Sequence, residues 1–173
     1  MAVTLKIATS LDGRIAMASG ESRWITGEAA RLEGHRLRAA HDAILVGVGT
    51  VLADDPALTV RLPGRAVDQP LRVVLDTALR TPVTAKVASG DTLILTVAEP
   101  ASVGAARVER IEAEEGRPAP RAVLAALAKA GVASVLIEGG GQVAAAFLRA
   151  GLVNRIEWFR APILLGAEGL PCV

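Results

Sequence analysis

The sequence predicts an α/β protein with a mostly parallel central sheet flanked by helices. Two observations favour this class. Short runs of branched aliphatic residues, typical of buried strands, alternate along the 173 residues with segments that have the spacing of amphipathic helices. Three predicted strands end in glycine and polar residues, at 47–54, 76–77 and 138–141. If these strands are parallel neighbours, their carboxyl ends meet at one edge of the sheet and form a ligand site there.

Length and composition restrict the class further. A chain of 173 residues with 51% hydrophobic residues is expected to form one domain, 1–173, and no apolar run approaches the length of a membrane span. The N-terminus lacks a signal-peptide pattern, and the single cysteine, Cys172, excludes an internal disulfide. We therefore expect a soluble cytoplasmic protein with no membrane partner.

Charge and side-chain inventory argue against two classes of function. A net charge of +1, with only two Trp and two Phe residues, argues against a nucleic-acid-binding protein. His35, His41 and Cys172 are the only soft metal ligands, and their spacing matches no zinc site, so no metal is expected. The strand ends instead favour a small ligand that carries phosphate.

The first third of the chain predicts a strand and a helix. Apolar and polar residues alternate over 3–9, which predicts a strand with one face in the core. A loop follows with Trp24, whose residue type fits either a core anchor or a ligand contact. Thr26 is the predicted N-cap of a helix that continues to about Ala40, with Glu28 in its first turn.

This helix carries a stripe of basic side chains. Arg31, His35 and Arg38 lie at positions i, i+4 and i+7, so they share one face of the helix. Two interpretations remain open. The stripe is either a solvated surface, which is the usual place for charges, or a phosphate site, for which the fork of arginine is well suited.

A second buried strand, 42–47, leads into a glycine-bearing segment with Thr50 and two adjacent carboxylates. Pro56 restricts Asp55 to extended backbone, so the pair Asp54 and Asp55 is expected to end an element. Adjacent carboxylates on an extended chain point to opposite sides, which argues against a dyad that shares a proton. One carboxylate is then a cap, and the other is available for a ligand.

The remaining elements follow from similar patterns. Further strands are predicted at 71–76, 92–97, 107–111 and 134–137. The acidic, proline-rich segment 112–120 is interpreted as a surface loop, and 121–130 as an amphipathic helix that Gly131 caps. The last apolar run, 156–166, predicts a strand that is bent or lies at a sheet edge, because Pro162 interrupts it.

The most informative stretch is 135–142, where an aliphatic strand ends in Glu138 and three glycines before an alanine-rich helix. Glycines let the backbone approach a ligand closely, and the first turn of the next helix presents unpaired N–H groups. This layout is typical of a phosphate cradle. The alternative is a plain turn between a strand and a helix, since the stretch matches neither the G-x-G-x-x-G fingerprint of dinucleotide-binding proteins nor the P-loop motif.

The sequence also resembles a known family, the reductase domain of the riboflavin biosynthesis protein RibD. The matching blocks are 6–16, 20–26, 49–61, 74–76, 137–140, 150–155 and 161–166, in the family's order and over nearly the whole chain. The resemblance implies a dihydrofolate reductase-like fold. It also implies NADPH-dependent reduction of 5-amino-6-(5-phosphoribosylamino)uracil to 5-amino-6-(5-phosphoribitylamino)uracil, in a homodimer.

By this resemblance the functional residues fall on particular positions. The cofactor positions are Ala8, Trp24, Thr50, Asp54, Thr77, Gly140, Gly141, Gln142, Val143, Ala144, Ala145 and Ala146. The positions for the phosphorylated pyrimidine substrate are Ser22, Arg38, Leu58, Arg61 and Glu138. Asp54 and Glu138 are the side-chain candidates for delivering a proton during catalysis, with water as the alternative. Thr77 and Arg80 are the candidates for recognising the 2′-phosphate of NADPH.

The chain also departs from the family pattern. It lacks the zinc-deaminase signatures that commonly precede this domain, so any deaminase is expected on a partner or a separate domain. It also ends where relatives usually continue into strands that complete the sheet and the dimer contact. Two other functions stay open: a reductase of the same fold that acts on another pterin or pyrimidine, and a non-catalytic nucleotide-binding module.

Overall fold

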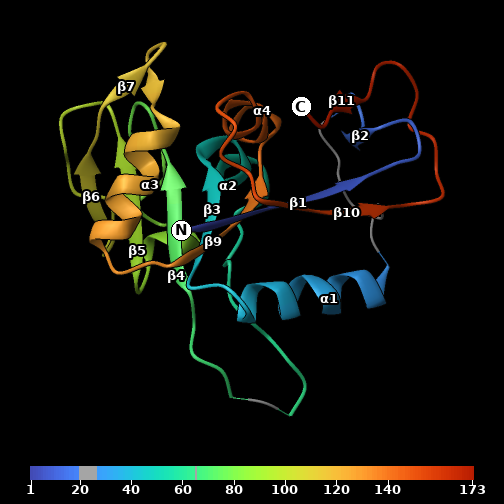
Figure 1. The fold of residues 1–173 in the computed structure, drawn as a ribbon, viewed down its shortest axis with the longest axis horizontal. Helices are drawn as coiled ribbons and strands as arrows, with labels where there is room; N and C mark the ends of the chain where they lie inside the picture. The colour runs from blue at the N-terminus through green and yellow to red at the C-terminus, as the bar shows by residue number, and fades with distance from the viewer. Residues whose placement is uncertain (20–26, 65) are drawn as a thin grey trace.

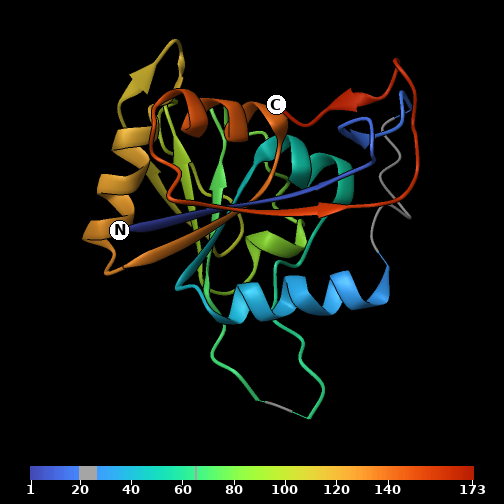
Figure 2. The same ribbon diagram turned by 45° about the vertical axis from the view of Figure 1, so that its right-hand side comes forward.

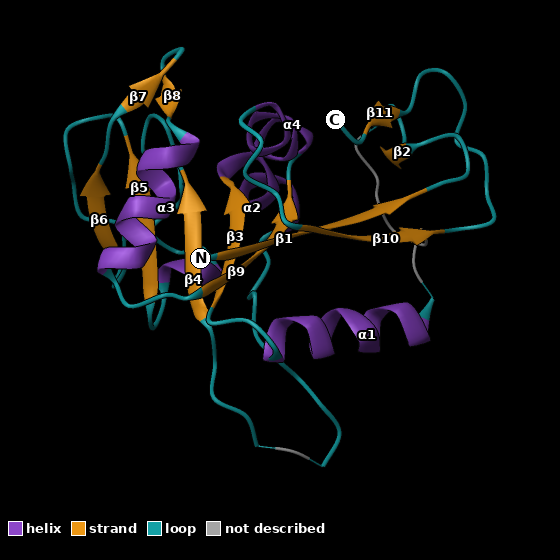
Figure 3. Ribbon diagram, in the orientation of Figure 1, coloured by secondary structure: helices purple, strands orange, loops and turns teal. Residues whose placement is uncertain are grey.

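The computed structural model describes residues 1–19, 27–64 and 66–173. In this part of the chain seven strands form one sheet in the order β10-β1-β9-β3-β4-β5-β6, and every neighbouring pair is parallel (Figure 1, Figure 3). The strands are β1 (Ala2–Thr9), β3 (Ala43–Gly47), β4 (Leu71–Leu75), β5 (Thr92–Thr96), β6 (Arg107–Arg110), β9 (Ser134–Gly139) and β10 (Arg155–Arg160). The predicted α/β class with a mostly parallel sheet is confirmed.

Helices cover both faces of the sheet. The helices are α1 (Glu28–Ala39), α2 (Val48–Asp54), α3 (Pro120–Lys129), α4 (Gly141–Arg149) and a short 3-10 helix, η1 (Lys86–Ala88). Side chains of α3 and α4, such as Val123 and Phe147, pack into one hydrophobic cluster, and those of α2 and η1 pack into a second one. Figures 1 and 2 both show α1 apart from these, lying below β1 and β10.

The residues of β3 show why this sheet is buried on both faces. Ala43 and Leu45 belong to the cluster under α3 and α4, whereas Ile44 and Val46 belong to the cluster under α2. Successive side chains of a strand point to opposite faces, so a continuous aliphatic run fits only a strand that is covered twice. Burial of each large aliphatic side chain stabilises the fold by roughly 1.5–3 kcal/mol.

Strand β1 was predicted to bury one face only, but it is buried more fully than that. It lies between β9 and β10, and Thr4 and Thr9 are as buried as the aliphatic residues beside them. Both hydroxyls have partners. The oxygen of Thr4 is 2.9 Å from Nε2 of His41, and the oxygen of Thr9 accepts a hydrogen bond from the indole of Trp158 at 2.9 Å. The polar positions of the alternating pattern therefore mark satisfied buried groups.

Three local predictions need correction. The N-cap of α1 is Gly27, which has no side chain to cap this end, and the predicted N-cap Thr26 lies outside the described residues. The segment after β3 forms α2, which the sequence analysis did not predict as a helix. The expected surface loop contains a hairpin, β7 (Ala113–Glu114) and β8 (Arg117–Pro118), whose turn residues Glu115 and Gly116 both have positive φ. Two positive φ values are typical of the tight turns of hairpins.

The C-terminal segment folds back toward the start of the chain. Strand β10 lies at the sheet edge, as Pro162 predicted, and β11 (Leu170–Pro171) pairs antiparallel with β2 (Arg14–Ala16). Asp12 fastens this return, because its carboxylate accepts hydrogen bonds from the Ser10 hydroxyl and the amides of Leu165 and Gly166. These bonds, that of Ser10 first, lower the pKa of Asp12 to about 2.

The helices of the described residues are short. None of them is long and apolar enough to cross a membrane.

Candidate functional site

A cavity of about 890 Å³ lies at the carboxyl ends of the strands. It is lined by residues from β1, β3, β4 and β9, by α2 and α4, and by the β7–β8 hairpin. The three polar strand ends meet here, because β9, β3 and β4 are consecutive in the sheet. All described residues of the predicted cofactor set line the cavity except Ala145, and Trp24 lies outside the described residues. Their role in binding remains a prediction.

The glycine turn brings backbone close to the cavity. Gly140 has a φ of +89°, which other residues rarely adopt, and a Cβ on Gly139 would lie 2.7 Å from the hydroxyl of Thr50. The N-cap of α4 is Gly140, which has no side chain to cap the helix. Gly140, Gly141 and Gln142 all line the cavity, so the first turn of α4 forms part of its wall, which is the arrangement expected of a phosphate cradle.

Helix α2 separates the two adjacent carboxylates. Thr50 and Asp54, one turn apart, both line the cavity. Asp55 ends the helix with a φ of +40°, and its carboxylate accepts a hydrogen bond from the amide of Lys86 at 2.9 Å, which lowers the pKa of Asp55. The prediction that Pro56 holds Asp55 in extended backbone is therefore wrong, because Asp55 adopts a left-handed conformation at the end of α2. Asp55 takes the structural role expected of one of the two carboxylates, and the availability of Asp54 to a ligand stays a prediction.

A turn after β4 presents a third group of side chains. The buried carboxylate of Asp76 accepts hydrogen bonds from the amide and the hydroxyl of Thr81, both at 2.7 Å. These bonds close the turn from which Thr77 and Arg80 reach the cavity lining. Asp76 is thus a positioning residue for this wall, a role that residue type alone did not reveal.

Two predicted substrate residues contact each other. Arg38 donates to both carboxylate oxygens of Glu138, from Nε at 2.6 Å and from Nη2 at 2.7 Å, and its Nη1 donates to the carbonyl of Thr59 at 3.0 Å. The two side chains are only 17% and 8% exposed. Each carboxylate oxygen keeps a second lone pair, and two of the five guanidinium N–H groups are not used by these bonds. Glu138 also lines the cavity.

The other substrate positions are more dispersed. The amide of Arg61 donates to Nδ1 of His35 at 3.2 Å, so His35 is not simply a solvated surface group. Burial, followed by the charges of Arg38 and Arg61, lowers the pKa of His35. Leu58, with a φ of +51°, is buried in the core and does not line the cavity, so its predicted role in substrate binding stays a prediction. Ser22 lies outside the described residues.

The cavity also contains cations that the sequence analysis did not select. Lys6 and Arg117 both line it. Lys6 belongs to a strand that pattern assigned to the core, and Arg117 belongs to the segment interpreted as a loop. Lys6 lies in the middle of β1 opposite Glu157 of β10, and no local pattern of the sequence marks either cation as a cavity residue.

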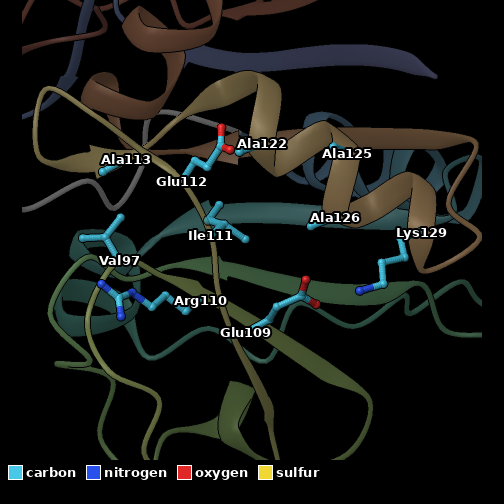
Figure 4. Close-up of a pocket in the computed structure, with 10 residues that line it drawn as sticks. All are labelled: Val97, Glu109, Arg110, Ile111, Glu112, Ala113, Ala122, Ala125, Ala126 and Lys129. Carbon is cyan, nitrogen blue, oxygen red and sulfur yellow. The ribbon is translucent and has the colours of Figure 1, made fainter.

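A second hollow lies elsewhere on the molecule. It has a volume of about 660 Å³ and lies between β6 and α3, where alanines and Lys129 of the helix lie across from charged residues of the strand such as Glu109 (Figure 4). None of the predicted site residues lines it. In the described part of the chain no group of three or more His, Cys, Asp or Glu side chains is placed to hold a metal ion. The larger cavity is therefore the candidate site.

Fold and site together define the class of protein. A parallel sheet whose strand ends converge on one cavity, beside a glycine turn that opens a helix, is a dihydrofolate reductase-like α/β protein with a site for a small ligand. The chain belongs to the RibD C-terminal domain family, whose model matches residues 1–173.

Individual relatives agree with this assignment. The riboflavin biosynthesis protein RibD of Mycobacterium tuberculosis is 50% identical over 166 residues, which cover 95% of this chain and 43% of that protein. The structure of Acinetobacter baumannii RibD superposes with a TM-score of 0.87 at 37% identity, covering 99% of this chain and 49% of that one. A deaminase/5-amino-6-(5-phosphoribosylamino)uracil reductase of Thermotoga maritima gives 0.85 at 33% identity, covering 99% and 47%. This chain thus spans about half the length of these relatives.

Proposed function

We propose that this chain binds NADPH in the 890 Å³ cavity and reduces 5-amino-6-(5-phosphoribosylamino)uracil to 5-amino-6-(5-phosphoribitylamino)uracil. The observation that carries the proposal is the meeting of a glycine cradle with the Arg38–Glu138 pair at one sheet edge. The Thermotoga relative is named for both a deaminase and this reductase, and the chain covers about half of it. Residues 1–173 would then form one reductase domain, and a deaminase would be supplied by another domain or by a partner protein.

The cavity fits the cofactor in two respects. Its volume is within the range of ligand sites, and Gly140, which lines the cavity without a side chain, lets the backbone come close to a ligand. The start of α4 would hold the pyrophosphate, while Thr77 and Arg80, from the turn after β4, would hold the 2′-phosphate. When bound, the cofactor supplies the hydride that the reduction needs.

The protein contributes alignment and charge. Glu138, fixed by Arg38, would accept hydrogen bonds from ring N–H and amino groups of the pyrimidine through its remaining lone pairs. Arg61, with Ser22 and the two unused N–H groups of Arg38, would bind the ribose phosphate. Since its contact with Arg38 makes Glu138 an acceptor, Asp54 or a water molecule is the better source of the proton.

We also propose a cytoplasmic homodimer. The supports are the single cysteine, which fits a reducing compartment, and the resemblance to a family of homodimers. Sedimentation of the purified chain tests the dimer directly.

The test of the reaction is loss of NADPH absorbance with the deaminated pyrimidine as substrate. Glu138→Gln and Arg38→Ala should each lower kcat/KM by roughly a hundredfold or more, because both lose charge-assisted bonds to the substrate. Arg36→Ala is the matched control, since Arg36 lies on the same helix with only an exposed partner, Glu33. No turnover in the wild-type protein, with NADPH still bound, would point to the non-catalytic module instead.

A further inference from the structure

The β7–β8 hairpin, far in sequence from the strand ends, forms one wall of the cavity. Four of its residues, 115–118, line the cavity together with the glycine turn and α4. Figures 1 and 3 show the hairpin beyond the carboxyl ends of β4 and β5, on the side of the sheet edge where α4 begins. The wall has no counterpart among the sequence-predicted site residues.

Arg117 is the cation of this wall, and its exposed side chain makes a hydrogen bond to the first turn of α4. Its Nη1 donates to the side-chain oxygen of Gln142 at 2.8 Å. Gln142 is the second residue of α4 and itself lines the cavity. The guanidinium is therefore held beside the first turn of α4 with one of its five N–H donors used in this bond. The remaining donors have the fork geometry that matches two phosphate oxygens.

We propose that Arg117 is a cofactor-binding residue that contacts the pyrophosphate of the dinucleotide. The proposal deepens the function given above and rests on it. We choose the pyrophosphate because of where Arg117 lies. Arg117 bonds to the helix that follows the glycine turn, whereas Arg80 comes from the turn after β4. Arg117 therefore contributes equally to NADPH and NADH, and Arg80 contributes only to the form with a 2′-phosphate.

Measuring the dissociation constants of NADPH and NADH separates the two arginines. Arg117→Gln should weaken both dinucleotides by roughly tenfold to a hundredfold, the loss expected for charge-assisted hydrogen bonds, and leave their ratio unchanged. Arg80→Gln should weaken NADPH only. Arg117→Lys keeps the charge without the fork and should fall between the wild type and Arg117→Gln.

Two controls make the result specific. Arg121→Gln removes an exposed charge four residues away that does not line the cavity, and it should bind as the wild type does. Raising the salt concentration should weaken cofactor binding more in the wild type than in Arg117→Gln, because the variant has lost one screened attraction.

The outcomes are distinct. Unchanged affinity of Arg117→Gln for both dinucleotides overturns the assignment, and so does a loss confined to NADPH, which would place Arg117 at the 2′-phosphate. A wild-type protein that binds neither dinucleotide overturns the proposed function and this inference together. An equal loss for both, with normal thermal unfolding of the variant, supports Arg117 at the pyrophosphate.

Discussion

At the scale of single residues, the Arg38–Glu138 pair is the contact on which both stability and the site depend. Each side chain is at least four-fifths buried, and each is the other's bidentate partner. A buried pair adds little net stability over apolar residues, yet removal of one partner leaves an uncompensated charge. The pair is therefore expected to be more sensitive to single substitutions than to a double one.

We predict that Arg38→Ala lowers the free energy of unfolding by about 3 kcal/mol, the typical cost of leaving a buried charge without its partner. Combining it with Glu138→Gln should restore part of this loss. The exposed pair of Arg36 and Glu33 is the comparison, and Arg36→Ala should cost less than about 1 kcal/mol. Urea titrations of Arg38→Ala, Glu138→Gln, their combination and Arg36→Ala measure these values. If the effects of Arg38→Ala and Glu138→Gln simply add in the double variant, the prediction is contradicted.

Asp12 gives the fold a defined dependence on pH. Its pKa in the folded protein is about 2, below the ordinary value of 3.8, so folding favours the charged carboxylate. The stabilisation is fully present above about pH 4 and is lost as the pH falls toward 2. The difference in thermal midpoint between wild type and Asp12→Asn should therefore shrink over this interval. Asp68→Asn, at an exposed loop position, should show no such trend.

At the scale of elements, the strands of the sheet were easier to predict than α2 and the β7–β8 hairpin, which form walls of the cavity. The aliphatic runs of β3, β5 and β9 fit one structure only, a strand covered on both faces. Helix α2 begins Val48-Gly49-Thr50, residues of low helix propensity, and it is stabilised by packing of Val48 and Val51 that local pattern does not show. The β7–β8 strands have two residues each, too few for any periodicity.

The contact between the glycine turn and α2 also leads to a prediction. A Cβ on Gly139 would lie 2.7 Å from the Thr50 hydroxyl, so Gly139→Ala should cost about 1–3 kcal/mol of stability and weaken NADPH binding. Gly34 lies inside α1 with no atom within 4 Å of an added Cβ. Gly34→Ala should instead stabilise by up to about 1 kcal/mol. Equal effects of the two substitutions in thermal unfolding would refute the argument.

At the scale of the whole molecule, general rules for parallel sheets predicted where the site lies, but not which of its side chains bond to one another. Carboxyl ends of neighbouring strands must share an edge, which is why the ends of β3, β4 and β9 could be grouped from the sequence. The bond between Arg38 and Glu138 joins residues 100 positions apart, and that of Arg117 with Gln142 joins a hairpin to a helix. Such pairs depend on how the elements pack together, and no local sequence pattern shows this packing.

The strand order also sets the sequence of events when the chain folds. Strands β3, β4, β5 and β6 are neighbours both in the chain and in the sheet, so each pairs with the one before it. Strand β1 pairs instead with β9 and β10, and the partners of Thr4 are Leu136 and Arg155. Distant pairings form slowly. In pulsed hydrogen exchange during refolding, the amides of β1 should gain protection after those of β4, and earlier protection of β1 would contradict this order.

The same topology delays the pairing of β1 while the chain is synthesised on the ribosome. Within this domain β1 is made before the other strands of the seven-stranded sheet, and it pairs in that sheet only with β9 and β10, which are made more than a hundred residues later. Its residues Val3, Leu5 and Ile7, which are buried in the finished core, therefore stay without their sheet partners while most of this domain is synthesised, and such a segment is the kind that chaperones hold. Pairing of β1 with β9 joins the middle of the sheet, and β10 then completes the edge beside β1.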